Sequence, residues 1–368
     1  MIEILPAKDK KTFKEFLNFP FRLYSKNHFW VPPLLKDIKE QFSSKNPFFK
    51  HAEVMPFIAK IKGETAGRIT AIYNKAYMDF YGEKTGFFGF FDCIDKKEVA
   101  VALMEEVKQW LREKGASMLM GPTNFSSNEE WGLLIEGFDE PPMIMMPYNF
   151  PYYQKLFERC GLTKAKDLFA YIIDIPEKLP EKAYRVAGIA EKQGIKVRPF
   201  NMNSFKSEMA IFKSVYNSAW EKNWGFVPMT DEEIDYTAKK LKQIMIPELT
   251  LIAECNGEAV GFIMMLPDFN FVLKKINGRL LPLGLFKALY YSRKIKDLRL
   301  LLLGIKPGYR RRGVDSLLFI EGLKAMLAKG FKKVEFSWIL EDNYPVQRII
   351  ETFKGNLYKK YRIYEIEI

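Results

Sequence analysis

The sequence predicts an α/β protein made of two related domains. Its 368 residues exceed what one core usually holds, so the length favours two domains. In addition, an Asn-x-Pro motif with a glycine twelve residues after the asparagine occurs twice, at 149–161 and at 343–355. An internal repeat of this kind indicates a duplicated fold.

Each copy of the repeat predicts a helix that runs into a strand. Apolar residues at helical spacing fill 152–160 and 346–354. Asn149 and Asn343 are expected to cap these helices, with the proline in the first turn and the glycine at the C-terminal end. The strands that follow are predicted at 168–174 and 361–368.

The segments before each copy match in order as well. Each half contains an apolar strand, an amphipathic helix that ends in glycine, and another strand. These elements are predicted at 86–94, 99–115 and 117–122 in the first half, and at 298–305, 316–330 and 333–340 in the second. The stretch between the halves contains prolines and mixed charges, which is typical of a linker. The predicted domains are therefore 1–175 and 193–368, with a linker at 176–192.

The composition is that of a globular protein, with 48% hydrophobic and 28% charged residues. Three cysteines without metal-ligand spacing and two histidines argue against a disulfide framework and a metal site, and fit a reducing cytoplasm. The first residues lack the apolar core of a signal peptide, and no apolar run of about 18 residues predicts a spanning helix. We therefore expect a cytoplasmic protein without a transmembrane segment. The formal net charge of +12 favours phosphate-bearing ligands.

The stretch 303–317, LGIKPGYRRRGVDSL, carries the clearest functional signal. A leucine-rich strand ends in a Pro-Gly turn, three arginines and Gly313 follow, and a helix begins. The free N–H groups and the positive dipole end of a helix N-terminus bind phosphate. Gly313 lets the backbone approach a ligand closely, and the arginines add charge-assisted hydrogen bonds. The pattern predicts a pyrophosphate site.

This stretch resembles the acetyl-CoA-binding motif of the GNAT acyltransferase superfamily, Val-x-Pro-x-x-Arg-x-x-Gly-x-Gly/Ala. Ile305, Pro307, Arg310 and Gly313 fit that motif. The helix at Asn343 resembles the second GNAT motif, and both halves are similar to a GNAT fold in the order of their elements. The resemblance implies two tandem GNAT-like domains, each a mixed, mostly antiparallel sheet flanked by helices, with the first one degenerate.

The resemblance also implies which residues bind the co-substrate, acetyl-CoA or another acyl-CoA. Strand amides at Leu303 and Ile305 would hold the pantetheine, and the loop from Arg310 to Ser316 would hold the pyrophosphate. The residues expected at the cofactor are Leu303, Ile305, Arg310, Arg311, Arg312, Gly313, Val314, Asp315, Ser316 and Asn343.

The sequence departs from the family pattern at two positions. Asp315 replaces the final Gly/Ala of the motif, where a carboxylate would repel a pyrophosphate unless it points away. Ile350 stands where the family often has a tyrosine that protonates the leaving thiolate. Tyr344 and Tyr358 are the candidate substitutes for this acid. Glu341, which follows the strand 333–340, is the candidate general base.

The first half has no comparable arginine loop, and Asp92 and Asp95 stand at the equivalent place. We expect that copy not to bind CoA, and to shape the acceptor site or serve as scaffold. Asn124, Ser126 and Asn128 lie in a loop of turn-forming and amide residues and are the candidate substrate-binding residues. The alternative for this loop is a purely structural network of turns.

The segment 280–296 is apolar and aromatic at first and basic at its end. It resembles an amphipathic surface helix, and the interpretation we favour is a helix packed on the sheet with a lysine-rich exposed edge. The alternative is a contact with a membrane or an acyl chain.

Three functional hypotheses follow. The first is an N-acyltransferase that moves an acyl group from acyl-CoA to an amine of a small molecule or protein. The second is an aminoacyl-tRNA-dependent transferase of the peptidoglycan-bridge type, for which the positive charge would suit tRNA. The third is a non-catalytic, degenerate GNAT binding module. The sequence leaves the acceptor, the acyl length and the oligomeric state open.

Overall fold

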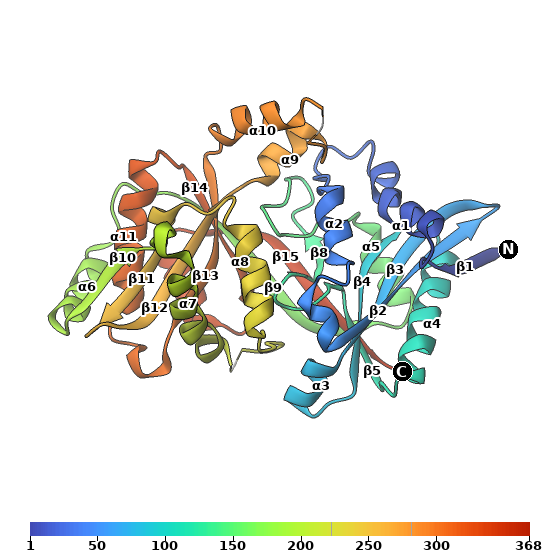
Figure 1. Cartoon of the computed structure of the whole chain (residues 1–368), viewed down its shortest axis with the longest axis horizontal. Helices are drawn as coiled ribbons and strands as arrows, with labels where there is room; N and C mark the ends of the chain where they lie inside the picture. Colours follow the sequence, from blue (N-terminus) through green and yellow to red (C-terminus); the bar gives the residue numbers. More distant parts are fainter. Residues whose placement is uncertain (222, 281) are drawn as a thin grey trace. The chain divides into compact units, whose positions relative to one another are not determined.

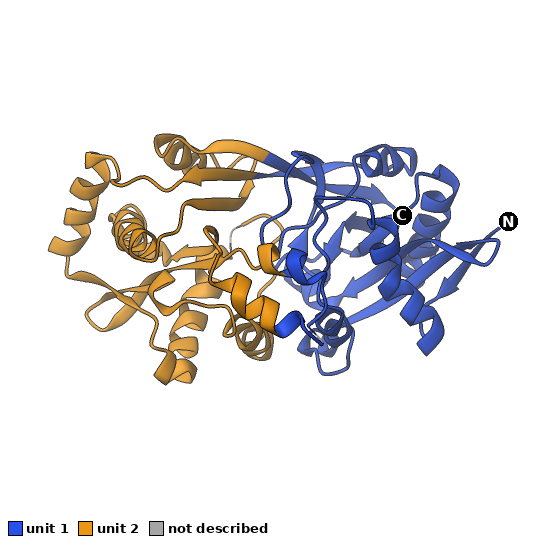
Figure 2. Cartoon of the chain, turned by 90° about the horizontal axis from the view of Figure 1, so that it is seen from above, with its two compact units in different colours: residues 1–169, 273–285, 359–368 blue, residues 170–272, 286–358 orange. Residues whose placement is uncertain are grey.

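A computed structural model of the chain describes residues 1–221, 223–280 and 282–368. The chain forms two compact units (Figure 2). Unit 1 contains residues 1–169, 273–285 and 359–368, and unit 2 contains residues 170–272 and 286–358. The sequence predicted a single linker at 176–192, but residues 181–192 of it form a helix, α6 (Glu181–Lys192). The chain also passes between the units near residues 272, 285 and 358.

The sheet of unit 1 is mixed and mostly antiparallel. Its strands are β1 (Ile2–Pro6), β2 (Ala52–Ile61), β3 (Glu64–Asn74), β4 (Thr85–Cys93), β5 (Met118–Gly121), β8 (Leu133–Glu136) and β15 (Asn356–Glu367). Neighbours from β1 to β4 pair antiparallel, and β4 pairs parallel with β5. The C-terminal part of β15 then pairs antiparallel with β5 and with β8. Residues near the C-terminus thus complete the sheet of the N-terminal unit.

Helices flank the strands of unit 1 (Figure 1). They are α1 (Lys10–Leu23), α2 (Leu35–Gln41), α3 (Lys75–Tyr81), α4 (Lys97–Glu113) and α5 (Tyr152–Arg159), with a 3-10 turn at η1 (Pro47–Lys50). Buried Val99, Leu103, Val107 and Leu111 recur at four-residue spacing along α4, as expected for a helix with one core face.

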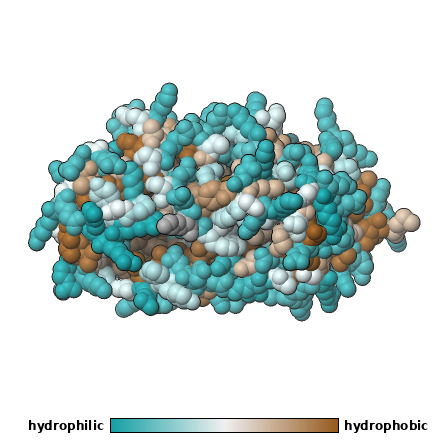
Figure 3. Space-filling view, turned by 90° about the horizontal axis from the view of Figure 1, so that it is seen from below, coloured by the Kyte–Doolittle hydropathy of each residue, from teal (hydrophilic) through white to brown (hydrophobic). Residues whose placement is uncertain are grey.

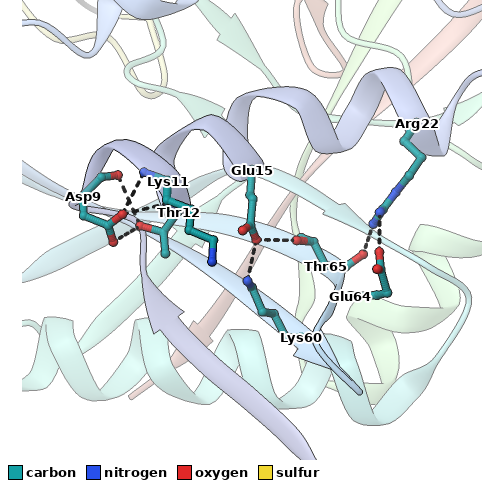
Figure 4. Close-up of polar contacts among 8 residues, drawn as sticks. All are labelled: Asp9, Lys11, Thr12, Glu15, Arg22, Lys60, Glu64 and Thr65. Carbon is teal, nitrogen blue, oxygen red and sulfur yellow. Dashed lines mark hydrogen bonds and ion pairs between the residues drawn. The ribbon is translucent and has the colours of Figure 1, made fainter.

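Polar contacts fix α1 on the β2–β3 hairpin (Figure 4). The Asp9 carboxylate caps the helix by accepting hydrogen bonds from the backbone N–H groups of Lys11 and Thr12. One turn further, Glu15 Oε2 lies 2.6 Å from Lys60 Nζ on β2. Near its end, Arg22 Nη1 lies 2.9 Å from Glu64 Oε2 on β3. The helix is therefore held at both ends as well as along its apolar face.

The sheet of unit 2 repeats this pattern. Its strands are β10 (Ile195–Pro199), β11 (Thr250–Cys255), β12 (Glu258–Pro267), β13 (Asp297–Ile305) and β14 (Lys333–Leu340). Neighbours from β10 to β13 pair antiparallel, and β13 pairs parallel with β14. Strand β9 (Thr163–Asp174) passes from unit 1 to unit 2. The predicted fold class, α/β with mixed and mostly antiparallel strands flanked by helices in each of the two units, is confirmed.

Helices α6 to α12 follow β9 along the chain, and α9 and α10 each have residues in both units. The six besides α6 are α7 (Phe205–Trp220), α8 (Asp231–Leu241), α9 (Asn270–Ile276), α10 (Gly284–Ser292), α11 (Val314–Ala328) and α12 (Tyr344–Thr352); α9 and α10 adjoin the points where the chain passes between units. Single turns and short strands also occur at β6 (Thr123–Asn124), β7 (Glu130–Trp131), η2 (Met202–Ser204), η3 (Pro247–Leu249) and η4 (Pro307–Tyr309). Helix α11 packs beside α6 (Figure 1).

Helices α7 and α11 cover opposite faces of β13. A Cβ at Gly304 would meet the Trp220 ring of α7, whereas a Cβ at Gly261, which is paired with Ile305, would meet Val314 of α11. Since successive residues of a strand point to opposite faces, these contacts place the two helices on the two sides of the sheet.

The predicted capping by the two repeat asparagines was wrong. Asn343 occupies the N-cap position of α12, but its side chain makes no capping hydrogen bond to the described residues. In the first copy Pro151 is the N-cap of α5. Asn149 is buried and joins β8 instead, accepting from the N–H of Leu134 at 2.8 Å and donating to its carbonyl at 3.0 Å. Its amide supplies both a donor and an acceptor, so it satisfies both backbone groups of Leu134.

Candidate functional site

The strands β13 and β14 part at the centre of unit 2. Their parallel ladder runs from Asp297–Lys333 to Leu300–Phe336. Both strands then continue past the last described pair, β13 through residues 301–305 and β14 through residues 337–340. The facing backbone edges of these two segments are therefore available to a ligand.

The amides of Leu303 and Ile305 face this gap. The N–H of Lys306 donates to the carbonyl of Val260 on β12 at 2.9 Å. In an antiparallel pair, backbone groups alternate between the two edges of a strand. Residues 302 and 304 therefore bond to β12 with Lys306, and Leu303 and Ile305 direct their backbone groups to the other edge. This is the orientation that their expected contact with pantetheine requires.

A tight loop joins the end of β13 to α11. Arg311 and Gly313 have left-handed backbones, with φ of 61° and 83°. A Cβ at Gly313 would lie 2.3 Å from the carbonyl oxygen of Val186 on α6, so both conformation and space require glycine there. Helix α11 begins at the next residue, and no described side chain caps it. Its first N–H groups, at residues 314–316, can therefore donate hydrogen bonds to an anion.

The three arginines of the loop differ in their contacts. Arg310 Nη2 donates to the carbonyl of Ala219 on α7 at 2.8 Å, and its Nε donates to the carbonyl of Ile305 at 3.3 Å. Arg310 thus ties the loop to the protein. Arg311 and Arg312 are exposed, and the Arg312 guanidinium lies 5.2 Å from the centre of the Tyr309 ring. These two supply the positive charge at the helix N-terminus.

Asp315 and Ser316 lie in the first turn of α11 and are half-buried, and Val314 is fully buried. A carboxylate in a first turn interacts favourably with the helix dipole. Val314 contributes its backbone N–H to the loop while its side chain packs in the core.

A buried polar network lies where the two strands part. Arg299 and Glu335 are paired across the ladder and are 1% and 0% exposed, with Arg299 Nε 3.6 Å from Glu335 Oε1. Ser337 Oγ accepts from Arg299 Nε at 3.0 Å and donates to Glu335 Oε1 at 2.6 Å. The hydroxyl of Tyr358, at the start of β15, donates to the other oxygen of Glu335. Arg299 was not among the predicted site residues, although a single arginine within a run of leucines is an unusual signal.

The candidate catalytic residues are placed differently. Tyr358 joins the network at the strands, whereas Tyr344 is 62% exposed at the first position of α12. Glu341 is half-buried in the turn after β14, and its carbonyl accepts from Gln347 at 3.0 Å. Ile350, at the position of the family's tyrosine, is fully buried, and a Cβ at Gly355 would lie 2.3 Å from its Cγ2. Ile350 is therefore a core residue.

Comparison with known proteins agrees with this geometry. The sequence pattern of the "Acetyltransferase (GNAT) family" matches residues 211–354, which include the gap, the arginine loop and α12. The chain belongs to the GNAT family. "Protein YghO" of Escherichia coli (strain K12) is 36% identical over 98% of this chain and 94% of its own length. A protein of Caulobacter vibrioides named "Bacterial ceramide synthase" is 35% identical over 99% of this chain and 97% of its own.

The fold of the whole chain is also that of a tandem GNAT protein. A solved structure described as "Tandem GNAT protein from the clavulanic acid biosynthesis pathway (without AcCoA)" matches 100% of this chain and 98% of its own, with a TM-score of 0.59 and 11% identity. The two mixed sheets described above are thus two GNAT copies in one chain. In the described residues, no group of three or more His, Cys, Asp or Glu is placed to hold a metal ion, and no helix is long and apolar enough to cross a membrane.

In the first GNAT copy, a closed cluster of side chains stands where β4 ends. Asp92 Oδ2 lies 2.7 Å from Arg68 Nε, and Asp92 Oδ1 accepts from the hydroxyls of Tyr24 at 2.9 Å and Tyr153 at 3.3 Å. Burial raises the pKa of Asp92 even though Arg68 opposes the shift. Burial also raises the pKa of both tyrosines well above the ordinary value. These groups bond one another, in contrast to the open amides and exposed arginines of the second copy.

The candidate substrate-binding residues of the first GNAT copy are hydrogen-bonded within their own loop and to β4. Asn124 Oδ1 accepts from the N–H of Phe90 at 2.7 Å, and its Nδ2 donates to Glu130 at 3.0 Å. Ser126 Oγ accepts from the N–H of Asn128 at 3.3 Å. These bonds are those of a structural network of turns. A role in binding the acceptor remains a prediction.

Proposed function

We propose that this chain is an N-acyltransferase that moves an acyl group from acyl-CoA to an amine in the cytoplasm. The observation that carries the proposal is the gap between β13 and β14, which leads to the N-terminus of α11. The pantetheine would bond to the amides of Leu303 and Ile305. The pyrophosphate would meet the N–H groups of residues 314–316, with Arg311 and Arg312 beside it.

The reaction needs an amine, a thioester and two proton transfers. The amine nitrogen attacks the thioester carbonyl, the C–S bond breaks, and an amide forms. The nitrogen loses a proton and the CoA thiolate gains one. Holding amine and thioester in contact supplies most of the acceleration in such a reaction. The strand gap therefore matters more to the rate than any single acid or base.

Tyr358 is our candidate for the acid and Glu341 for the base. The Tyr358 hydroxyl is fixed by the Glu335 carboxylate next to the parting strands, whereas Tyr344 is exposed on α12. Glu341 follows the last residue of β14, at the end of the gap. These positions support Tyr358 and Glu341 as the groups closest to a thioester bound between the strands.

We further propose that the acceptor is a long-chain amine and the donor a long-chain acyl-CoA. A ceramide is the amide of a fatty acid with a long-chain amino alcohol. The Caulobacter vibrioides relative that is named a ceramide synthase spans nearly the whole of this chain at 35% identity. The relationship covers both GNAT copies, so it supports a shared substrate class as well as a shared fold.

The test uses the purified full chain with acetyl-CoA and palmitoyl-CoA as donors. Calorimetry measures binding, and a thiol reagent follows CoA release when sphinganine or a panel of short amines is added. The R311A/R312A double variant is expected to bind CoA about 10–100-fold more weakly, because each charge-assisted hydrogen bond contributes about 1.5–3 kcal/mol and exposure to solvent reduces this. K324A is the matched control, since Lys324 is an exposed cation further along α11.

Each outcome decides between hypotheses. Heat on adding CoA and thiol release with sphinganine support the proposal in full. Thiol release with short amines alone refutes the long-chain acceptor and keeps the acyltransferase. Binding without turnover on any amine favours the non-catalytic module. No heat at millimolar CoA, together with salt-dependent binding of tRNA, selects the tRNA-dependent alternative.

A further inference from the structure

Helix α10 exposes large apolar side chains on one face. Phe286 is 70% exposed, Leu289 59%, Tyr290 57% and Leu285 50%. These residues are one and four positions apart, so they form one stripe along the helix. Soluble proteins normally turn such a stripe inward, and a contiguous exposed one marks an interaction site.

The segment of the chain that contains the stripe is positively charged. Residues 270–296, which include α9 and α10, contain seven lysines and arginines and no aspartate or glutamate. All seven are exposed: Lys274, Lys275, Arg279, Lys287, Arg293, Lys294 and Lys296. The whole chain has 57 basic and 45 acidic residues, so a segment of this length without a single acid is unusual in it.

Aromatic rings link the basic residues to the stripe. Lys294 Nζ donates to the hydroxyl of Tyr290 at 2.6 Å and lies 4.2 Å from the centre of its ring. The ring of Tyr291 packs edge-on against Phe271 of α9, with the centroids 6.1 Å apart (the two helices are labelled in Figure 1). Tyrosines with an apolar body, a polar tip and a neighbouring lysine are the residues that favour a membrane interface.

We propose that α10 docks on an anionic phospholipid bilayer. Its nine residues span about 14 Å, which is less than half of a hydrocarbon core of about 30 Å, so the helix would lie along the interface. The apolar stripe would enter the boundary between headgroups and acyl chains, and the cations on and just after α10, Lys287, Arg293, Lys294 and Lys296, would meet anionic headgroups. Figure 3 shows the molecule from below relative to Figure 1. Hydrophilic residues cover most of that face, and hydrophobic residues are scattered over it.

This proposal stands without the proposed function, because it depends only on exposure and charge. If the acceptor is a long-chain amine, the same surface would also bring the protein to the layer where such a molecule resides.

The experiment is co-sedimentation of the purified chain with vesicles of phosphatidylglycerol and phosphatidylcholine, compared with vesicles of phosphatidylcholine alone. We expect binding to the anionic vesicles and weaker binding as salt screens the charges. The variant F286S/L289S should reduce the bound fraction about tenfold. The matched control is Y184S/I189S, which removes two exposed apolar side chains from α6. Circular dichroism checks that both variants keep the fold.

Two results would overturn the proposal. The first is equal vesicle binding by the wild type and F286S/L289S, or no binding by either. The second is a stable dimer in light scattering that F286S/L289S converts to a monomer while vesicle binding is absent, because the stripe would then cover a second copy of the chain. Loss of binding in F286S/L289S with retention in Y184S/I189S supports it.

Discussion

Arg299 and Glu335 form an ion pair one residue before β13 and β14 separate. Both side chains are fully buried, and the pair is extended by Ser337 and Tyr358. Burial removes the hydration of both charges. A buried charge whose partner has been removed therefore destabilises the folded state strongly. The pair therefore fixes the place at which the two strands part, and with it the start of the gap that we assign to the thioester.

Replacing Glu335 by glutamine should strongly destabilise the protein. E335Q leaves Arg299 buried without its anion, for which we expect a loss of about 3–5 kcal/mol in the free energy of unfolding. Urea unfolding measures it. The control is E258Q, which breaks the exposed contact of Glu258 with Lys306 at 2.7 Å and should cost at most about 1 kcal/mol. Equal losses in the two variants would contradict a special role for the buried pair.

Removing the Tyr358 hydroxyl tests whether Tyr358 is the acid of the reaction or has only a structural role. If Tyr358 protonates the thiolate, Y358F should lower kcat by about 10²–10⁴-fold and flatten the basic limb of the pH–rate profile. Its loss of stability should stay near 1–2 kcal/mol, the value of one hydrogen bond to a carboxylate. Y344F is the control, because Tyr344 is exposed and should leave kcat unchanged. An unchanged pH profile in Y358F would leave Tyr358 as a positioning residue.

Gly313 and Gly308 lie in the same loop but differ in their surroundings. G313A combines a left-handed φ of 83° with a contact of 2.3 Å to the carbonyl of Val186, so it should cost about 1–3 kcal/mol and weaken CoA binding. A Cβ at Gly308 meets nothing within 4 Å, so G308A should be neutral within about 0.5 kcal/mol. Thermal unfolding and CoA titration of both variants provide the comparison. Similar behaviour of the two would argue against the shape assigned to the loop.

Asp167 should make part of the stability depend on pH. Burial raises the pKa of Asp167, but hydrogen bonds from Arg362, at 2.7 and 2.9 Å, and from Lys164 outweigh it and hold the pKa below its ordinary value. Its stabilisation is therefore complete above the unfolded-state pKa of about 3.9 and is lost as the pH falls through the lower folded-state pKa.

D167N should then cost roughly 1–2 kcal/mol at pH 7, a value kept low because solvent screens part of the pair, and nearly nothing near pH 2. Urea unfolding at the two pH values measures the difference. The control is D95N, a substitution at an exposed carboxylate, which should change the free energy of unfolding by less than about 0.5 kcal/mol at pH 7. A penalty for D167N that is the same at both pH values would refute the assignment.

Local pattern predicted most of the elements around the site. The strand predicted at 333–340 has those bounds in the structure, and the strand predicted at 298–305 begins one residue earlier. The helix predicted at 316–330 is found at Val314–Ala328. The helix starts after Gly313, whose backbone is left-handed. The spacing of apolar residues does not predict such a backbone conformation.

Contacts between distant residues could not be predicted in this way. Arg310 donates to the carbonyl of Ala219 on α7, which is 91 residues away in sequence. The motif alone predicted only a contact of Arg310 with the pyrophosphate. Asn149 bonds to a strand peptide instead of its own helix, because the motif specifies a local cap but not a competing partner. Residues 359–368 belong to unit 1, although strand periodicity in 361–368 says nothing about which strand lies alongside.

The placement of residues 359–368 also sets the order in which the protein can mature. The ribosome makes unit 1 first, yet β5 and β8 receive their β15 partner only after unit 2 has been translated. Until then, β5 and β8 have unpaired strand edges, which are prone to pair with the wrong strand. Nascent chains stalled after residue 358 should accordingly remain sensitive to protease in unit 1, and chains released with residues 359–368 should become resistant. A segment translated after unit 2 thus completes the sheet of unit 1.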